Sequence, residues 1–417
     1  MEGITVGYEN YLSRLMELYE EYRTFDKGKI PLCAAENYVS PFSMQGLISH
    51  YEGKYVSGYI QRDKEKDFIG SDYLEKILYL ADDLARKLFH AKYNDFRSLT
   101  GMNTVALMLM SMVSRDSIIM ITDPISGGHG SLPKLCRNYG IQYKSIPFNY
   151  STMQVDYERL NELLRGKDEI SYLFFCQSDI VQPPDLNRID LPSNVGIIYD
   201  ATQTLGLIAG GALPNPLDQL QNIVLIGGTH KTFPGVTCGY VATNSDKIIQ
   251  QISLSISPNF LRNVQVNNIT SVCLSMIEML QFGERYASNI IYVANALGRA
   301  LTERGIYVKS ISDELFTKTH QIFIGTGSYS IDETYANFRK YGITLNKRNT
   351  AYITGFRIGV QEIARYGFEE HIDDLAELIR LVLDEPHKEK EILSLKAHLA
   401  KFKTNKYVID NIFMELE

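Results

Sequence analysis

A lysine in a short polar turn gives the clearest chemical signal in this sequence. Lys231 follows an apolar run, Ile223 to Ile226, and the pair Gly227 and Gly228. The apolar run predicts a buried strand, and a second short strand is expected over Gly239 to Ala242. A lysine sheltered between two buried strands loses its charge more readily than one in water, and the neutral amine is a nucleophile that forms Schiff bases with aldehydes.

An aspartate supplies the second half of this pattern. Asp200 ends the run Val195 to Tyr199, which also predicts a buried strand. Sites in parallel sheets lie beyond the carboxyl ends of the strands, so we expect Asp200 and Lys231 to face one crevice. Pyridoxal 5'-phosphate needs both groups, a lysine that holds its aldehyde and an anion that keeps its pyridine nitrogen protonated. A strand-end aspartate can instead cap the next helix, but the Gly-Gly-Thr-His-Lys-Thr segment downstream favours cofactor binding.

Four motifs, in this order along the chain, resemble those of the serine hydroxymethyltransferase family. They are an N-terminal signature, a Gly-Gly-His loop, a lysine motif and a carboxylate-binding segment: Leu32 to Pro41, Gly127 to His129, Thr229 to Thr232, and Gly355 to Gly359 followed by Arg365 to Phe368. The resemblance extends from about Pro31 to about Ile379 and identifies a divergent member. It implies the aspartate-aminotransferase-like α/β fold of pyridoxal-phosphate enzymes: a large domain with a mainly parallel seven-stranded sheet flanked by helices, plus a smaller α+β C-terminal domain.

The resemblance also implies which residues would hold the cofactor. Lys231 would form the Schiff base, Asp200 would face the pyridine nitrogen, and His129 would stack on the ring. Small residues before the apolar helix pattern of 105–113 would bind the phosphate, because a helix N-terminus offers free amides and the positive end of its dipole. The remaining cofactor-binding candidates are Thr100, Gly101, Met102 (through its backbone amide), Ser178, Gln203, Thr229 and His230.

The substrate would be an α-amino acid. Arg357 lies between two glycines, and a guanidinium can grip an α-carboxylate through two parallel hydrogen bonds that a lysine cannot reproduce. Tyr55 matches a family tyrosine that reaches the site of the neighbouring subunit, so it is a catalytic candidate together with Lys231, His129 and Asp200. The active form would then be a homodimer with shared sites.

The folate-side positions depart from the family pattern. The family's acid/base glutamate is replaced by Ser57, and a serine hydroxyl cannot hold a proton in reserve near neutral pH. Ser57 remains a substrate-binding candidate by position. Other departures from the family pattern are Ala35, the pair Asp67 and Phe68, and the insertion Gln61 to Lys66. Gln203 stands in place of a histidine, and Thr237 stands in place of an arginine. The segment Gly130 to Pro133 also differs, and Ser257 to Leu261 occupies the position where a glycine-rich loop is usual.

These features favour an enzyme that makes or breaks the Cα–Cβ bond of a β-hydroxy-α-amino acid through a quinonoid. It would be a threonine aldolase or transaldolase, working without folate and, as a transaldolase, adding an aldehyde. Three alternatives stay open: a folate-dependent serine/glycine hydroxymethyltransferase; other Cα chemistry from the same aldimine, such as racemisation, α-substitution, decarboxylation or transamination; and a non-catalytic cofactor-binding subunit. The intact pair of Lys231 and Asp200 argues against the last.

Composition excludes several other classes. The 417 residues suffice for two domains and a large core, and the formal charge of -7 gives no basic stripe for nucleic acid and no polybasic patch for a membrane. The N-terminus lacks a signal-peptide pattern, and no apolar run approaches the ~20 residues of a membrane helix. The five cysteines are scattered in apolar runs without metal-ligand spacing, so we expect reduced thiols, no metal and a cytoplasmic protein.

The elements that must position these residues alternate between apolar and polar segments. Apolar runs at 118–122, 172–176, 195–199, 223–226 and 321–325 predict strands. Helical spacing is found at 8–25, 71–90, 157–164, 267–302, 331–341 and 370–383, and the tail from 388 is also helical. This alternation indicates a mainly parallel sheet covered on both faces. We divide the chain into an N-terminal arm (1–50), a large cofactor-binding domain (51–285) and a small C-terminal domain (286–417), with the boundary near Tyr286.

Overall fold

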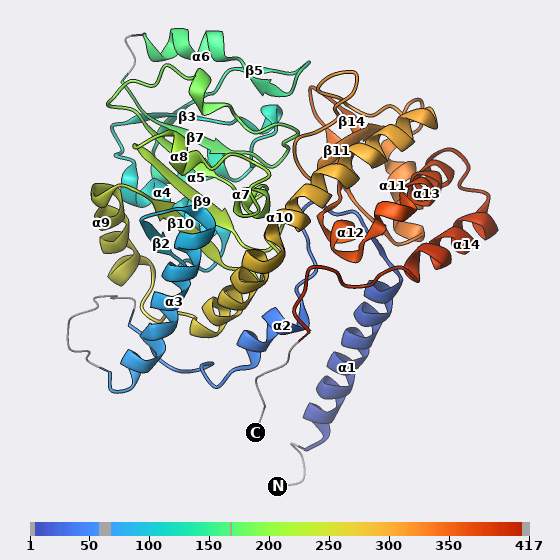
Figure 1. The fold of residues 1–417 in the computed structure, drawn as a ribbon, viewed down its shortest axis with the longest axis horizontal. Coiled ribbons are helices and arrows are strands. Elements are labelled where there is room, and N and C mark those ends of the chain that lie inside the picture. The colour runs from blue at the N-terminus through green and yellow to red at the C-terminus, as the bar shows by residue number, and fades with distance from the viewer. Residues whose placement is uncertain (1–4, 58–67, 167–168, 411–417) are drawn as a thin grey trace.

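A seven-stranded sheet forms the centre of the larger part of the molecule (Figure 1). The structure is a computed structural model that describes residues 5–57, 68–166 and 169–410. Within this sheet β10 runs against its two neighbours and the other pairings are parallel. The strand order is β2 (Tyr93–Asp95), β10 (Gly239–Thr243), β9 (Ile223–Gly228), β8 (Gly196–Asp200), β7 (Ile170–Cys176), β3 (Ile118–Ile121) and β4 (Gln142–Ser145).

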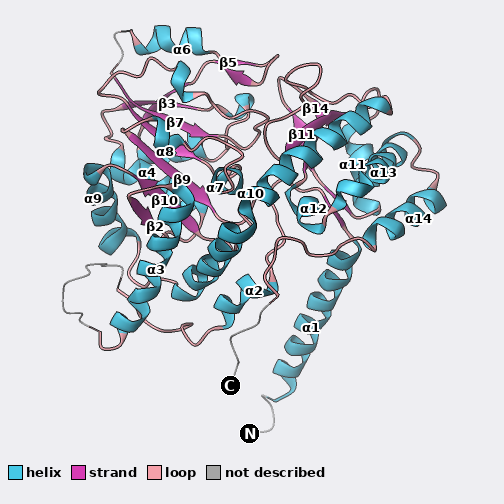
Figure 2. Ribbon diagram, viewed as in Figure 1, coloured by secondary structure: helices cyan, strands magenta, loops and turns pink. Residues whose placement is uncertain are grey.

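The central strands are apolar on both faces because helices cover both sides of the sheet (Figure 2). Alternate residues of β9 enter different cores: Ile223 and Leu225 pack with α3 (Ser71–Phe89) and α10 (Val266–Glu303). Their neighbours Val224 and Ile226 pack with α4 (Gly101–Met112) and α9 (Asp246–Ser255). The two-residue period of a strand thus divides one continuous apolar run between two cores.

The C-terminal region is built around a small antiparallel sheet. It has the order β11 (Gln321–Gly325), β14 (Thr354–Gly359) and β13 (Asn346–Asn349). Helices α11 (Ile331–Lys340), α12 (Gln361–Tyr366), α13 (Ile372–Asp384) and α14 (Glu389–Ala400) lie around it, and α10 runs from the large sheet to this region (Figure 1). The predicted boundary near Tyr286, inside α10, stays a prediction.

Short elements connect these layers. The strands among them are β1 (Ile30–Pro31), β5 (Phe148–Asn149), β6 (Gln154–Val155) and β12 (Ile343–Thr344). The α-helices are α2 (Pro41–Met44), α5 (Leu132–Tyr139), α6 (Tyr157–Leu164), α7 (Leu205–Ala209) and α8 (Pro216–Gln219). Single helical turns occupy Gln45–Ile48, Pro124–Ser126, Leu186–Arg188, Ile256–Phe260 and Phe368–His371.

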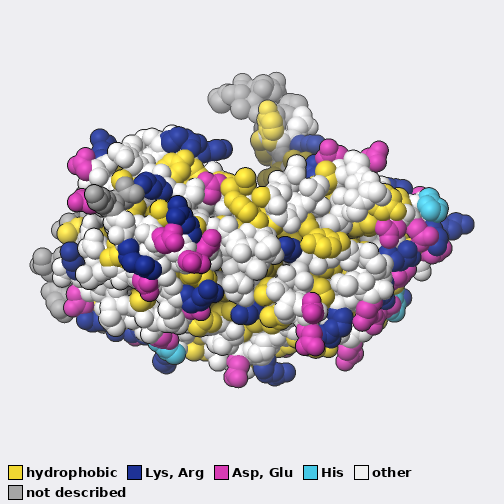
Figure 3. Space-filling model, turned by 90° about the horizontal axis from the view of Figure 1, so that it is seen from above, with side chains coloured by type: hydrophobic (Ala, Val, Ile, Leu, Met, Phe, Trp, Pro, Cys, Tyr) yellow, Lys and Arg dark blue, Asp and Glu magenta, His cyan; other side chains and the backbone are white. Residues whose placement is uncertain are grey.

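The N-terminal helix α1 (Thr5–Gly28) projects from the body of the molecule (Figure 1). Its large apolar side chains are mostly exposed, among them Tyr11 at 80% and Leu15 at 64%. Elsewhere, side chains of both charges are interspersed over the face seen in Figure 3. No helix in the described part of the chain has the length and apolar character needed to cross a membrane.

Candidate active site

A cavity of about 330 Å³ opens beyond the carboxyl ends of β7, β8 and β9, beside the N-terminus of α4. The parallel arrangement brings these strand ends to one edge, where sites of α/β sheets form. The predicted residues that line it are Thr100, Gly101, Met102, His129, Ser178, Asp200, Gln203, His230 and Lys231. Gln177, Thr202 and Thr237 line it as well and were not among the predicted site residues.

Lys231 extends from the loop that joins β9 to β10. The side chain of Asn37, from the N-terminal signature, donates to the Lys231 carbonyl oxygen and, at 2.8 Å, to the hydroxyl of Tyr286. These contacts fix the lysine backbone against the first segment and the long helix. Burial lowers the pKa of the Lys231 amine, the charge of Asp200 opposes that shift, and the charge of Arg357 adds to it. The site therefore favours the uncharged amine more than water does.

Asp200 is held at the end of β8 by its neighbours. The backbone amide of Thr202 donates to Oδ1 at 2.8 Å, and the Thr202 hydroxyl donates to the same oxygen. The thiol of Cys176 donates to Oδ2 at 3.1 Å. The Thr202 hydroxyl also accepts from the Gly228 amide at 2.9 Å, so it joins the ends of β8 and β9. An aspartate followed two residues later by threonine is a common turn pattern, which could have revealed Thr202 in the sequence.

The Gly-Gly-His loop places an imidazole in the cavity wall. Gly127 has φ +83°, and a Cβ on Gly128 would lie 2.0 Å from the carbonyl oxygen of Thr122, so neither position accepts a side chain. The amide of Ser131 donates to Nδ1 of His129 at 3.2 Å, which leaves the proton of the neutral ring on Nε2. Burial lowers the pKa of His129, and Asp200 opposes that shift.

The N-terminus of α4 approaches the end of β9 closely. Thr100 caps the helix by accepting from the Asn103 amide at 3.2 Å. A Cβ on Gly101 would lie 3.2 Å from the Gly228 amide nitrogen, so glycine permits this approach. The opening amides of a helix have no partner within it and can bind an anion. Next to them, the buried Nδ1 of His230 has no partner among the described residues, and burial lowers the pKa of this imidazole to about 4.

Arg357 lies in the middle of β14 and is engaged by acceptors from another part of the chain. Its Nη1 donates to the Ser178 carbonyl oxygen at 2.7 Å and to Asp179 at 2.9 Å, and its Nη2 donates to Asn346 at 2.7 Å. Its buried Nε has no partner among the described residues. The guanidinium is therefore anchored by its two terminal nitrogens, and its Nε edge has no protein acceptor.

Asp179 is the centre of this network. Both of its oxygens accept from Nε of Arg348 at 2.8 Å, and one accepts from the Tyr352 hydroxyl at 2.6 Å. Asp179 is only 4% exposed, so one buried carboxylate is shared by two guanidinium groups. We did not single out Asp179, Arg348 or Tyr352 in the sequence.

Four further predicted residues lie away from the cavity or face elsewhere. The Thr229 hydroxyl donates to the Val236 carbonyl oxygen inside its own loop, which closes the turn that presents Lys231. Tyr55 is 39% exposed and its ring lies 4.3 Å from that of Phe68, measured between centroids. Ser57 forms a β-bridge with Asn263. Arg357 lies outside the cavity lining, behind Ser178.

Some features noted in the sequence fall outside the described residues. These are the insertion Gln61 to Lys66 and Asp67. Gln203 is described and fully packed: its side-chain oxygen accepts from Gln321 at 3.0 Å. The functional roles predicted for the cavity residues stay predictions, whereas their common location is a property of the structure.

Comparison with known proteins gives consistent matches over the chain. The family model for serine hydroxymethyltransferase matches residues 9–381. The serine hydroxymethyltransferase of Pyrococcus furiosus is 27% identical over 404 residues, covering 92% of this chain and 93% of that protein. The one from Archaeoglobus fulgidus is 29% identical over 417 residues, covering 95% and 93%.

A solved structure shares the whole fold. The crystal structure of L-threonine transaldolase from Pseudomonas fluorescens superposes with a TM-score of 0.88 at 24% identity, covering 100% of this chain and 97% of that one. The likeness confirms the predicted α/β fold, with its mainly parallel sheet flanked by helices.

Proposed function

This chain belongs to the serine hydroxymethyltransferase family, as its motifs predicted, and from that membership we propose a specific activity. It is a pyridoxal-phosphate-dependent enzyme that makes or breaks the Cα–Cβ bond of a β-hydroxy-α-amino acid, of the threonine aldolase or transaldolase type. The observation that carries the proposal is the cavity in which a lysine amine, a carboxylate and an imidazole meet at the N-terminus of a helix.

The residues present fit the cofactor. The phosphate would lie at the amides of Gly101 and Met102, where Gly101 approaches β9 so closely that an added Cβ would force a shift of a few tenths of an ångström. The buried Nδ1 of His230 belongs to the same cavity-lining residue set and has no polar partner within the described part of the chain, and a bound group can supply one. Lys231 would hold the aldehyde carbon, and Asp200 would face the ring nitrogen. When bound, the cofactor supplies an electron sink for a bond broken at Cα.

The substrate's α-carboxylate would bind at Arg357. Asp179 and the Ser178 carbonyl oxygen hold Nη1, whereas the buried Nε has no partner among the described residues and is the nitrogen to which an incoming carboxylate would be paired once the site opens to it. Arg357 and Arg348 carry two positive charges against the single carboxylate of Asp179, which leaves one charge for the substrate to neutralise. A substrate held at its carboxylate has one Cα bond fixed in orientation, which is how positioning contributes to rate.

We assign proton transfer in this site to groups whose charged forms are disfavoured by burial. Cleavage of the Cα–Cβ bond of a β-hydroxy acid requires the β-hydroxyl proton to leave. The Lys231 amine has a lowered pKa and can accept a proton at Nζ once it is free. His129 is held with its proton on Nε2 and is disposed to donate a hydrogen bond.

The replacement of the family glutamate by Ser57 favours a folate-independent reaction. One alternative is a folate-dependent serine/glycine hydroxymethyltransferase, and the relatives compared above carry the name serine hydroxymethyltransferase. We place it second because Ser57 offers no carboxylate for acid/base work. The test described next also distinguishes other reactions at Cα and a non-catalytic role from the proposed activity.

The test is a comparison of amino-acid substrates on the purified enzyme loaded with pyridoxal phosphate. Incubation with L-threonine should release acetaldehyde without tetrahydrofolate, and addition of a second aldehyde should give a new β-hydroxy amino acid detectable by mass spectrometry. Serine cleavage that depends on tetrahydrofolate would support the folate-dependent alternative. Keto-acid formation, enantiomer exchange or loss of CO2 would identify another Cα reaction. No turnover of any amino acid would contradict the proposal.

We also propose a homodimer, in which Tyr55 would reach the partner's site. The support is α1, whose apolar side chains are exposed and face no other part of the described chain along most of the helix, including Tyr11, Leu12, Leu15, Met16, Tyr19 and Tyr22. An exposed apolar face of this length is typical of a surface covered in an assembly. The variant Leu15→Glu with Tyr19→Glu should shift the mass measured by light scattering toward one chain, whereas Glu20→Gln should not. An unchanged dimer in the double variant would contradict this use of α1.

The location we propose is the cytoplasm. The five cysteines are free and buried, as expected in a compartment that keeps thiols reduced.

A further inference from the structure

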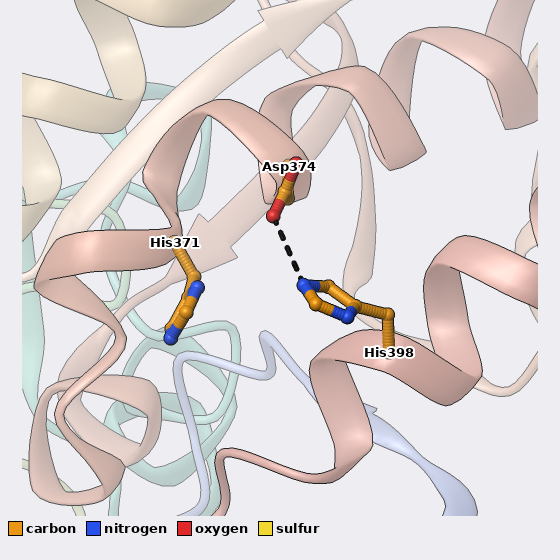
Figure 4. Close-up of side chains that lie close together, drawn as sticks. All are labelled: His371, Asp374 and His398. Carbon is orange, nitrogen blue, oxygen red and sulfur yellow. Dashed lines mark ion pairs between the residues drawn. The ribbon is translucent and has the colours of Figure 1, made fainter.

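Two histidines and an aspartate come together in the C-terminal region, far from the cavity in sequence. His371 ends the helical turn before α13, Asp374 lies in the first turn of α13, and His398 lies near the end of α14. One ligand atom from each residue lies within 4.8 Å of the other two. Figure 4 shows the three side chains directed toward a common space, with an ion pair of 3.5 Å between Asp374 Oδ2 and His398 Nε2. We propose that these three residues bind a divalent transition-metal ion, with Zn²⁺ as the probe.

The donor set fits such an ion. Two imidazole nitrogens and one carboxylate oxygen are ligands that zinc and its neighbours accept, whereas Mg²⁺ and Ca²⁺ prefer oxygen alone. Ligand atoms around tetrahedral zinc stand about 3.3–3.6 Å apart, which follows from bonds of about 2.0–2.2 Å. Asp374 and His398 already have this spacing, at 3.5 Å, and because no pair is farther apart than 4.8 Å the remaining contraction is at most about 1.5 Å, a movement that rotation of the half-exposed side chains would have to supply. The exposed side of the cluster leaves room for water as the fourth ligand.

Aromatic contacts limit the orientations of the two imidazoles. The ring of Phe402 stacks on His371 at 3.6 Å between centroids with an interplanar angle of 23°. The same ring meets His398 edge-on at 4.9 Å and 75°. Metal coordination uses the lone pair in the plane of the imidazole, so stacking on the ring face does not compete with it. Limiting the ring orientations in advance lowers the cost of ordering the ligands.

Metal binding at this position would join α13 to α14. The chain beyond α14 returns to the body: the Lys406 amide donates to the Arg365 carbonyl oxygen at 2.7 Å, and the Ile409 amide donates to Glu278 at 2.9 Å. A metal at His398 would therefore anchor the start of a segment whose end packs against α12 and α10. The expected consequence is greater thermal stability of this region, because a ligand that binds only the folded state stabilises it.

The experiment is a calorimetric titration of ZnCl2 into tag-free holoenzyme that has been treated with EDTA and dialysed. We expect one ion bound per chain. The variants His371→Asn and His398→Asn should each weaken binding by at least about 100-fold, since even loss of an outer-shell partner costs 10- to 100-fold. The matched control is His90→Asn, because His90 forms a similar pair with Asp218 at 3.8 Å in which no third ligand takes part among the described residues.

The melting temperature gives a second measurement on the same proteins. Zn²⁺ should raise it for the wild type and for His90→Asn, but not for His371→Asn or His398→Asn. The proposal is overturned by no binding to the wild type, or by equal binding in the cluster variants and the control. Cofactor content and threonine cleavage should be unchanged in the cluster variants, so this result is separable from the proposed function.

Discussion

The contacts of Arg357 with other protein residues were not predicted from the sequence. Arg357 was predicted to bind a carboxylate, and within the protein it already donates hydrogen bonds to Asp179, Ser178 and Asn346. Anchoring by the terminal nitrogens orients the guanidinium, and its buried Nε has no partner among the described residues. Pre-orientation of this kind reduces the ordering that substrate binding must otherwise cause.

We predict that Arg357→Lys weakens amino-acid binding strongly. An ammonium on a flexible stem cannot form two parallel hydrogen bonds to a carboxylate, so a loss of about 2 kcal/mol, or roughly 30-fold in KM, is expected. Arg348→Lys is the matched control, because Arg348 contacts Asp179 and not the proposed carboxylate position. KM values from a threonine-cleavage assay decide this, and an Arg357→Lys enzyme with the wild-type KM would remove Arg357 from the substrate site.

Asp179→Asn should destabilise the fold. Removing this carboxylate leaves two guanidinium groups close together without their shared partner, and breaking a buried pair from one side costs about 3–5 kcal/mol. Asp190→Asn is the comparison, since its pair with Arg165 is exposed and should matter by less than about 1 kcal/mol. Urea unfolding of both variants measures the difference, and equal stabilities would contradict the role of Asp179.

The sequence could predict which residues lie at the ends of the strands, but it could not predict the contacts of Asp179. Asp200 directly follows an apolar run, and Ser178 and Lys231 follow their apolar runs within five residues, so the parallel-sheet rule predicted all three at one edge. Asp179 and Arg348 are separated by 169 positions, and no periodicity or motif connects them. Their pairing depends on how the C-terminal sheet packs against the large one, which a single sequence does not encode locally.

Among the elements, α4 lines the cavity with the residues of its N-terminus. Its N-terminus meets the end of β9 at Gly101, where a Cβ would lie 3.1 Å from the Thr202 hydroxyl and 3.2 Å from the Gly228 amide nitrogen. The helix and the strand must both stay in position for the opening amides to face the cavity.

We therefore predict that Gly101→Ala weakens pyridoxal-phosphate binding by about tenfold, or about 1.4 kcal/mol. The added methyl group would push the helix N-terminus away from β9 by a few tenths of an ångström. Gly130→Ala is the control, because a Cβ there has no neighbour within 4 Å. Fluorescence titration of the cofactor-free proteins with pyridoxal phosphate measures the affinity of each variant. Equal affinities in Gly101→Ala and Gly130→Ala would contradict the prediction.

Elements were predictable where apolar residues dominate. The strands β7, β8, β9 and β11 and the helices α3, α6 and α10 lie within a few residues of their predicted bounds, because buried runs and helical stripes leave a clear period. Edge strands were missed: β4 reads Gln-Tyr-Lys-Ser and β13 reads Asn-Lys-Arg-Asn, and both are largely polar or exposed. A strand that pairs on one side only needs little apolar surface, so its sequence carries a weak signal.

At the scale of the whole molecule, buried histidines make stability depend on pH. His320 is 0% exposed, and burial lowers its pKa to about 3; that of His230 is lowered to about 4. An imidazole in the unfolded chain titrates near 6.5, so the unfolded state binds protons first as the pH falls. The stability from these neutral rings is complete above about pH 6.5 and is lost progressively toward about pH 3.

We predict that the free energy of unfolding falls by a few kcal/mol between about pH 7.5 and about pH 4.5. In His320→Gln the slope of stability against pH should be smaller, whatever the absolute stability of that variant. Urea unfolding at several pH values gives both slopes. A wild-type stability that stays flat over this range, or the same slope in His320→Gln, would contradict this account of acid sensitivity.

The central claim is that Lys231 holds pyridoxal phosphate in the cavity at the strand ends, and one measurement tests it most directly. The enzyme loaded with the cofactor is reduced with borohydride, digested and analysed by mass spectrometry, with Lys231→Ala and the exposed-site variant Lys92→Ala treated in the same way. We predict a phosphopyridoxyl group on the peptide that contains Lys231 in the wild type and in Lys92→Ala, and none in Lys231→Ala. Attachment to a different lysine, or no attachment in the wild type, would contradict the assignment of this cavity as the active site.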